Sequence, residues 1–397
     1  MKDGWLGWAV FVGMSWTWCI GMFLPVLLVH DYGVWAWLVF AVPNVVGAAA
    51  MAWTISAGRS RLMVEAHRPA MIAFSTITVA FQLFFAVWAF SRPPWQAAFY
   101  PWYLLGVVVV AIAGMVRKAS RLLSIMILFG SIACAIGMFH RGEASLTAMG
   151  GAGNLSLPPS SALLWLTPVC FFGFLLCPYL DATFHRARQH LADRNAKRAF
   201  GIGFGVVFLS AIVLTLLYSR PVHVAMNSYQ RVPLILRWVK VYWMLQLGFT
   251  IGVHLIGDDG QNQEQRAWPS ATIAAAGIVI GASALGIGQK FMIPGETVYR
   301  AFLGFYALVF PAYVWLAVLP GRGVLAPTRR AMAVLAIVVA IALPMFYLAF
   351  IQQRLFWAVP GVAVVLLSRA LISKSAGNPQ DEMGLGFTAQ QNSAPTS

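Results

Sequence analysis

The sequence predicts an all-α polytopic membrane protein with about 12 transmembrane helices. Hydrophobic residues make up 60% of its 397 residues and charged residues only 10%, whereas soluble domains are roughly 25% charged. The apolar residues gather in runs of about 20, which is the length that a helix needs to cross a bilayer. The lipid bilayer is therefore the expected surrounding of nearly the whole chain.

In chain order, the apolar runs give twelve predicted spans, near 5–28, 33–57, 69–91, 98–116, 120–140, 162–182, 199–219, 233–257, 268–288, 297–319, 329–350 and 352–370. Only Gln352 to Arg354 separates the last two, so a re-entrant piece is an alternative there. We expect 1–140 to form a first five-helix repeat, 141–161 an external loop, and 162–319 a second, inverted five-helix repeat. Two additional C-terminal helices (320–374) and a polar, disordered cytoplasmic tail (375–397) would follow.

Two of these spans, about 150 residues apart, carry the same interruption. Trp18-Cys19-Ile20-Gly21-Met22-Phe23-Leu24-Pro25 reappears as Cys170-Phe171-Phe172-Gly173-Phe174-Leu175-Leu176-Cys177-Pro178. Gly weakens a helix and Pro removes an intrahelical hydrogen bond, so we expect a break near the middle of each span. Such pairs of interrupted spans are typical of transporter binding sites. The alternative is an ordinary proline kink filled by packing.

Basic residues are distributed unevenly between the two predicted sides of the membrane. With the N-terminus inside, most of the 27 Lys and Arg fall in inner segments. The positive-inside rule then places both termini in the cytoplasm, and we expect a bacterial inner (plasma) membrane. Because the basic residues lie in short loops and form no basic domain, nucleic acid is not an expected partner.

The residue inventory argues against enzyme and metal chemistry. Cys19, Cys134, Cys170 and Cys177 lie in apolar runs without zinc-ligand spacing, so neither a metal site nor a disulfide framework is expected. No nucleophile elbow, Walker motif or paired carboxylates occur, so we expect no enzyme activity. The 12 Asp and Glu fall in loops, tails or helix ends, and Asp181, the nearest to a span, is expected to pair with local arginines.

The span near 233–257 carries a polar stripe. Gln246, Thr250 and His254 recur at every fourth position, so they share one helix face, which we expect to look into the bundle. Thr250 can coordinate an ion, and His254 can relay a proton. Alternatively, Gln246 and Thr250 bond neighbouring helices while His254 lies at the cytoplasmic interface.

Two regions resemble the sodium:solute symporter family. Residues 15–57, with Ser15-Trp16-Thr17, Gly21, Pro25, Tyr32-Gly33-Val34-Trp35 and Gly47, are similar to its first two core helices. Residues 165–200, with Phe172-Gly173, Pro178-Tyr179-Leu180 and Asp193-Arg194-Asn195-Ala196-Lys197-Arg198, resemble its sixth core helix and the following loop. This distant resemblance implies the leucine-transporter fold of the amino acid-polyamine-organocation superfamily, which consists of ten helices in two inverted repeats. The adjacent Ser and Thr that help the family bind sodium are replaced by Phe249-Thr250-Ile251.

The sequence thus predicts a secondary-active transporter-like protein that moves a small solute by alternating access, without a resident cofactor and with sodium or a proton as the coupling ion. The expected substrate-binding residues are Trp18, Cys19, Gly21, Met22, Phe172, Gly173, Phe174 and Gln246, and the expected coupling residues are Ile20, Thr250 and His254. The alternative is a non-transporting relative that serves as a membrane sensor or as a structural subunit with protein partners in a membrane complex. The replacement of the family's sodium-binding Ser and Thr by Phe249-Thr250-Ile251 and the lack of mid-bilayer carboxylates favour this alternative.

Overall fold

The computed structural model describes residues 4–92, 100–141, 159–227, 235–256, 268–319 and 324–372, and within these ranges it contains helices and no strands. The first half comprises α1 (Trp5–Ser15), α2 (Cys19–Tyr32), α3 (Val34–Thr54), α4 (Ala57–Ala66), α5 (Arg68–Phe90), α6 (Tyr100–Gly114) and α7 (Arg117–His140). The second half comprises α8 (Pro159–Leu176), the 3₁₀ turn η1 (Cys177–Leu180), α9 (Ala182–His190), α10 (Asp193–Ile202), the π-helix η2 (Gly203–Phe208), α11 (Leu209–Asn227), α12 (Ile235–Leu255), α13 (Ser270–Lys290), α14 (Gly295–Tyr313) and η3 (Val314–Val318). Helices α15 (Arg329–Phe350), η4 (Leu355–Trp357), α16 (Ala358–Ser368) and η5 (Arg369–Leu371) end the described chain.

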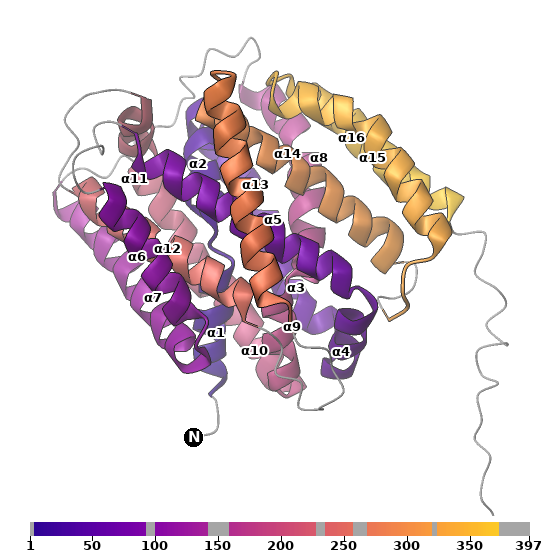
Figure 1. Cartoon of the computed structure of the whole chain (residues 1–397), viewed down its shortest axis with the longest axis horizontal. Helices are drawn as coiled ribbons and strands as arrows, with labels where there is room; N and C mark the ends of the chain where they lie inside the picture. Colours follow the sequence, from indigo (N-terminus) through magenta and orange to yellow (C-terminus); the bar gives the residue numbers. More distant parts are fainter. Residues whose placement is uncertain are drawn as a thin grey trace, which may run out of the picture.

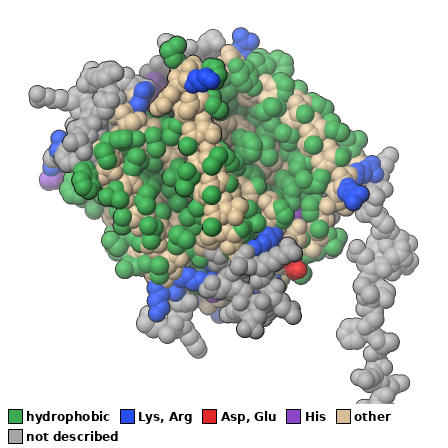
Figure 2. All heavy atoms as spheres, viewed as in Figure 1, with side chains coloured by type: hydrophobic (Ala, Val, Ile, Leu, Met, Phe, Trp, Pro, Cys, Tyr) green, Lys and Arg blue, Asp and Glu red, His purple; other side chains and the backbone are tan. Residues whose placement is uncertain are grey.

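Within the described residues, eight helices are long and apolar enough to cross a membrane, and α1 with α2 adds a ninth if this bent pair is one span. Helix α6 and the segment Leu355–Leu371 are shorter, and α12, which is rich in aromatic and polar side chains, does not belong to the eight. Hydrophobic side chains cover most of the face seen in Figure 2, and Lys and Arg gather at its rims. The chain is therefore an all-α, multi-pass membrane protein. Most of the predicted loop 141–161 and all of the predicted tail 375–397 lie outside the described residues.

The helices pack mainly between the two halves of the chain (Figure 1). The two most extensive contacts join α5 to α13 and α6 to α12, followed by α3 with α8 and α2 with α11. Small residues permit these close approaches. A Cβ built on Gly248 of α12 would lie 2.6 Å from the Val107 carbonyl oxygen of α6, and one on Gly277 of α13 would lie 2.7 Å from a methyl carbon of Val79 on α5.

Helices α15 and α16 lie along one side of this bundle (Figure 1). They pack chiefly against each other, and α15 also contacts α14. The four cysteines are free thiols buried among apolar side chains, and no cluster of three metal-ligating side chains occurs within the described ranges. The buried core is therefore formed mainly by the helices from α1 to α14, with α15 and α16 packed on its side.

Candidate functional site

The first interruption separates α1 from α2 at Trp16-Thr17-Trp18, where the helix pair bends by 54°. Three side chains satisfy carbonyls at the end of α1, which have no partner within the helix. Ser15 donates to the Val12 carbonyl (3.1 Å), Thr17 to the Gly13 carbonyl (3.0 Å) and the Trp18 indole to the Ser15 carbonyl (2.7 Å). Side chains that bond nearby carbonyls in this way compete with helix continuation.

The break therefore lies before the predicted Cys19-Ile20-Gly21-Met22, which form the first turn of α2. Pro25 lies in the second turn of α2 without breaking it. Because Pro has no N–H, the carbonyl of Gly21 lacks its usual intrahelical donor.

Two buried glutamines bind the two ends of this break. Gln246 of α12 donates from Nε2 to the Met14 carbonyl of α1 (2.8 Å) and to the Thr250 hydroxyl (3.2 Å). Gln82 of α5 accepts at Oε1 a hydrogen bond from the backbone N–H of Cys19 (3.3 Å), the first residue of α2. Both side chains are fully buried, and each keeps one amide atom, Gln246 Oε1 and Gln82 Nε2, without a hydrogen-bond partner within the described ranges.

These amides occupy positions that attract ions. A helix C-terminus carries partial negative charge and a helix N-terminus partial positive charge. With Gln246 on the Met14 carbonyl, all four carbonyls from Val12 to Ser15 have a protein donor. Side chains of the protein therefore bind the carbonyls at the end of α1 and the N–H group at the start of α2, which could otherwise bind a cation and an anion.

The polar stripe of α12 faces the interior, as the helical spacing predicts. Gln246, Thr250 and His254 are at most 1% exposed. The His254 imidazole hydrogen-bonds through Nδ1 to the Ser75 hydroxyl of α5 (3.2 Å) and packs edge-on against the Trp18 indole, with ring centroids 5.4 Å apart. His254 is therefore buried against Trp18 of the first break and is not exposed at an interface.

The second interruption lies after the predicted Gly173. Helix α8 is continuous through Gly173 and ends at Leu176, where the 3₁₀ turn Cys177–Leu180 begins. Pro178 cannot donate to the Phe174 carbonyl. Gly47 of α3 packs against that oxygen, because a Cβ built on Gly47 would lie only 2.3 Å from it. The break thus lies at Pro178, and Gly47, which has no Cβ, allows α3 to pack directly against the backbone there.

Asp181 follows this turn and caps α9. Its Oδ1 accepts hydrogen bonds from the Thr183 N–H and hydroxyl, both at 2.7 Å, and the Thr183 hydroxyl lies 3.4 Å from the Ser15 hydroxyl at the end of α1. Asp181 is fully buried, and its Oδ2 has no partner among the described residues. Arg186, the predicted partner, interacts with Asp181 through its charge, while its guanidinium donates to the carbonyls of Val253 and Ile256. The end of α1 and the start of α9 are therefore in polar contact at Ser15 and Thr183.

A pocket of about 920 Å³, which includes its open mouth, lies between α2, α8 and α14. Its walls are mostly aromatic and aliphatic, and they come from both interrupted segments and from α15 and η4. The lining residues include Trp16, Trp18, Ile20, Gly21, Leu24, Leu166, Cys170, Gly173, Phe174, Tyr306, Ala307 and Phe350. A pocket of this kind suits a largely apolar small molecule.

Few polar groups reach this pocket. Asn44 of α3 lines it and accepts a hydrogen bond from the Trp16 indole. Arg300 of α14 also lines it, but its guanidinium is bound by Asp31 and Glu296, each at 2.7 Å. The positive charge is thus already neutralised, and the Arg300–Asp31 pair ties the end of α2 to α14.

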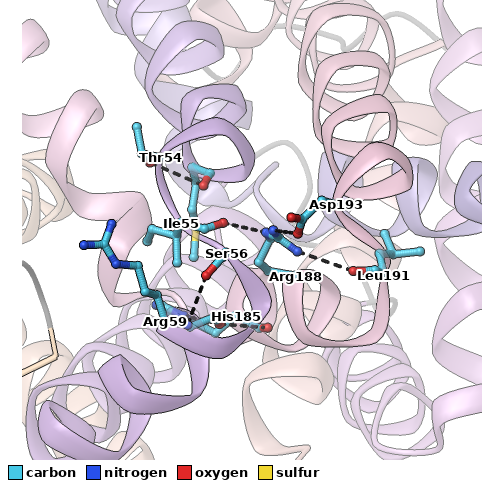
Figure 3. Close-up of polar contacts among 10 residues, drawn as sticks. Thr54, Ile55, Ser56, Arg59, His185, Arg188, Leu191 and Asp193 are labelled. Carbon is cyan, nitrogen blue, oxygen red and sulfur yellow. Dashed lines mark hydrogen bonds and ion pairs between the residues drawn. The ribbon is translucent and has the colours of Figure 1, made fainter.

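A second polar cluster joins α3 to α9 and α10 (Figure 3). Arg188, which is buried, donates to the Ile55 carbonyl (2.6 Å) and the Leu191 carbonyl (3.3 Å) and forms an ion pair with Asp193. His185 hydrogen-bonds through Nε2 to the Tyr179 carbonyl (3.0 Å) and through Nδ1 to the Ser60 hydroxyl (2.8 Å). Because a carbonyl only accepts, Nε2 carries the proton and Nδ1 accepts. Burial lowers the pKa of His185 to about 4, so the ring is neutral at pH 7.

The predicted site residues therefore divide into two groups. Trp18, Ile20, Gly21, Gly173 and Phe174 line the pocket. Cys19, Met22, Phe172, Gln246, Thr250 and His254 are buried outside its lining, and the carbonyls of Cys19 and Met22 accept hydrogen bonds from Tyr299 and Tyr218.

Four residues of the site were not predicted as binding residues: Asn44, Gln82, Asp181 and Arg300. A signal existed for two of them, because Asn44 and Gln82 are amides within long apolar runs, where a polar side chain is costly unless it has a role. No family model matches the chain, and no curated protein sequence is significantly similar to it.

Proposed function

We propose that this protein is a secondary-active transporter-like carrier that moves a small, largely apolar and uncharged solute by alternating access. The observation that carries the proposal is the pocket between α2, α8 and α14, because it is lined by residues of both interrupted segments. The aromatic and aliphatic walls favour an apolar solute. The paired Arg300 and the capped ends of α1 and α2 leave no strong attraction for a charged one.

The proposed architecture has twelve spans, with two inverted five-helix repeats followed by two C-terminal helices. The reciprocal packing of the halves supports it. The third span of the first repeat (α5) packs on the fourth of the second (α13), and the third of the second (α12) packs on the fourth of the first (α6). The contacts of α3 with α8 and of α11 with α2 are reciprocal in the same way. Inverted repeats around a central site are a common transporter plan.

We further propose that both termini are cytoplasmic, so that the end of the bundle with α4, α9 and α10 faces the cytoplasm (Figure 1). These three helices carry a concentration of basic residues, which supports this orientation under the positive-inside rule: Arg59, Arg61, Arg186, Arg188, Arg194, Lys197 and Arg198. The Arg300–Asp31 pair would then lie toward the external side and the Arg188 cluster toward the cytoplasm.

The proposed carrier does not use sodium at the first break. The Gln246 amide bridges the Met14 carbonyl and the Thr250 hydroxyl, which are the groups that a sodium ion would need as ligands there. Binding of sodium there would require the buried Gln246 amide to give up both acceptors and to leave its own N–H groups without a partner, which is costly.

The experiment is a thermal-stability screen of the purified protein across uncharged aromatic and aliphatic solutes. A ligand that binds only the folded state raises the melting temperature. The Gly173→Leu variant should abolish the shift by filling the pocket, since the only atom near a Cβ at Gly173 is Ala307 Cα at 4.0 Å. The matched control is Gly286→Leu on an exposed face of α13, where nothing lies within 4 Å. A shift that Gly173→Leu leaves unchanged would place binding elsewhere and refute the proposed site.

A membrane sensor or structural subunit is the second candidate, and the two glutamines favour it. They tie α1 to α12 and α2 to α5, which are contacts that alternating access has to rearrange. Solute uptake into proteoliposomes separates the two functions. Binding with uptake supports a carrier, whereas binding without uptake supports a sensor.

A further inference from the structure

We propose that Asp181 is the site at which this protein binds the proton that it couples to solute movement. The inference rests on the proposed carrier function and adds the identity and place of the coupling ion. Asp181 is the only fully buried carboxyl among the described residues.

The hydrogen bonds of Asp181 leave one position for a proton. Oδ1 is occupied by the N–H and hydroxyl of Thr183, whereas the buried Oδ2 has no partner among the described residues. An ionised carboxylate with an unsatisfied, desolvated oxygen is costly. Binding of one proton from bulk water at Oδ2 removes the charge without displacing an existing hydrogen bond, and release returns that proton to bulk water.

The position of Asp181 suits a coupling role. The turn Cys177–Leu180 leads directly to it, and Cys177 at the start of that turn lines the solute pocket. On the other side, Ala182 and His185 line a small hollow next to α9. Asp181 thus lies in the chain between the solute pocket and a hollow that, in the proposed orientation, is on the cytoplasmic side.

The contacts of Asp181 also link its charge to conformation. Its partner Thr183 lies 3.4 Å from the Ser15 hydroxyl at the last turn of α1, so the bond from Thr183 to the carboxylate positions α9 against the first break. Neutralising the carboxylate weakens its hydrogen bonds from Thr183, because charge-assisted hydrogen bonds are about twice as strong as neutral ones. Protonation is therefore expected to loosen the contact between α1 and α9.

The ionisable groups around Asp181 leave it as the one buried carboxyl of the described residues that can titrate there. The elements packed around this turn contribute Arg186 and His185 from α9, Tyr306 and Tyr313 from α14, His67 from the start of α5, and His254 from α12. The other carboxyls on these elements and on α4, which packs against α9, are Glu296, which is paired with Arg300, and Glu65, which is exposed. A proton needs only the one free oxygen, whereas a metal cation needs several ligands around an open space, and Asp181 lines none of the three pockets described in this structure.

The test uses protons alone, so it does not depend on finding the solute. Infrared difference spectra of the full-length protein in lipid are recorded as a function of pH. In the wild type, the carbonyl band of a buried carboxylic acid should appear as the pH falls. The band should be lost in Asp181→Asn, which keeps a good helix N-cap, and in Asp181→Ser, which provides a second capping variant if the first folds poorly. Glu65→Gln, on an exposed position of α4, should leave the band unchanged.

Hydrogen exchange supplies the conformational readout. In the wild type, the protection factors of peptides covering 12–22 and 177–190 should fall as the pH is lowered, whereas in Asp181→Asn, whose side chain is always neutral, they should be low at both pH values. If Asp181 is only a helix cap, both variants will keep the infrared band and show the wild-type exchange, and the proposal is overturned. If the band depends on Asp181 but no solute binds or is taken up, the proton site stands and the carrier function fails.

Discussion

Replacement of Gln246 tests whether the chain's own amide takes the place of a coupling cation. Gln246 is fully buried and donates to the Met14 carbonyl and the Thr250 hydroxyl. Gln246→Leu preserves the volume and removes both hydrogen bonds, which should lower the free energy of unfolding by about 1–3 kcal/mol. Gln246→Glu places a carboxylate beside the negative end of α1 and should destabilise the protein more strongly, because a buried charge without a partner costs several kcal/mol.

A sodium ion can neutralise the glutamate in that variant. At a concentration about ten times its dissociation constant, sodium would restore about 1.4 kcal/mol by mass action. The assay is thermal unfolding in sodium, potassium and choline chloride at equal ionic strength and at pH 8. Wild-type protein should melt at one temperature in all three salts, whereas Gln246→Glu should melt higher in sodium. The control is Gln289→Glu, which makes the same charge change at an exposed position of α13.

A sodium-specific rise in the melting temperature of the wild type, lost in Thr250→Val, would refute this reasoning. It would show that sodium reaches the position between α1 and α12 despite the amide. The ion proposed at Asp181 would then be at most a second coupling ion.

Three further predictions concern stability. Gly47→Ala should cost about 1–3 kcal/mol or more, because its Cβ would meet the backbone of α8, whereas Gly130→Ala, with open space around it, should be neutral or slightly stabilising in chemical or thermal unfolding. The pKa of His185 is lowered from an ordinary 6.5 to about 4, so the buried ring is stable only when neutral. The free energy of unfolding should therefore be highest above pH 6.5 and fall between pH 6.5 and 4, by roughly 3 kcal/mol at most. His185→Gln should flatten this part of a stability–pH curve. Arg188→Lys should lower the melting temperature, because one ammonium cannot match a planar guanidinium that reaches two carbonyls and Asp193; an unchanged melting temperature would mean that this cluster is not structurally important.

Much of the architecture could be predicted from the sequence because lipid imposes simple rules. Long apolar runs become helices, since backbone groups cannot remain unbonded in a bilayer. The spacing of Gln246, Thr250 and His254 predicted their inward orientation for the same reason, because polar side chains avoid lipid. These inferences need only local sequence and the properties of the solvent.

The exact places of the breaks could not be predicted in this way. The breaks were expected at the level of Gly21 and Gly173, but the helices end at Ser15 and Leu176. At the first break, the donors of Ser15, Thr17 and Trp18 outweigh the effect of Pro25. Helix ends depend on which side chains capture the last carbonyls, and a proline in an early turn of a helix does not decide this.

The side chains that hydrogen-bond the backbone at the first break were the least predictable part of the site. Gln82 lies 63 residues from the backbone group that it binds, and Gln246 lies 232 residues from its own. Only the tertiary packing of α5 and α12 around the first break brings them there. An amide inside an apolar run signals that some polar partner exists, but it does not identify that partner.

The two glutamines also restrict which ion could drive the proposed carrier. They come from α5 and α12, which are the third spans of the two proposed repeats, and they bind opposite ends of one break. An amide serves both ends because its oxygen accepts and its nitrogen donates. A fixed amide cannot dissociate, so it cannot convert an ion gradient into motion. Asp181 is the only fully buried carboxyl in the described chain, and it can lose its charge by taking up a single proton at its unpartnered Oδ2. If this protein is driven by an ion, the structure therefore favours a proton at the second break over sodium at the first.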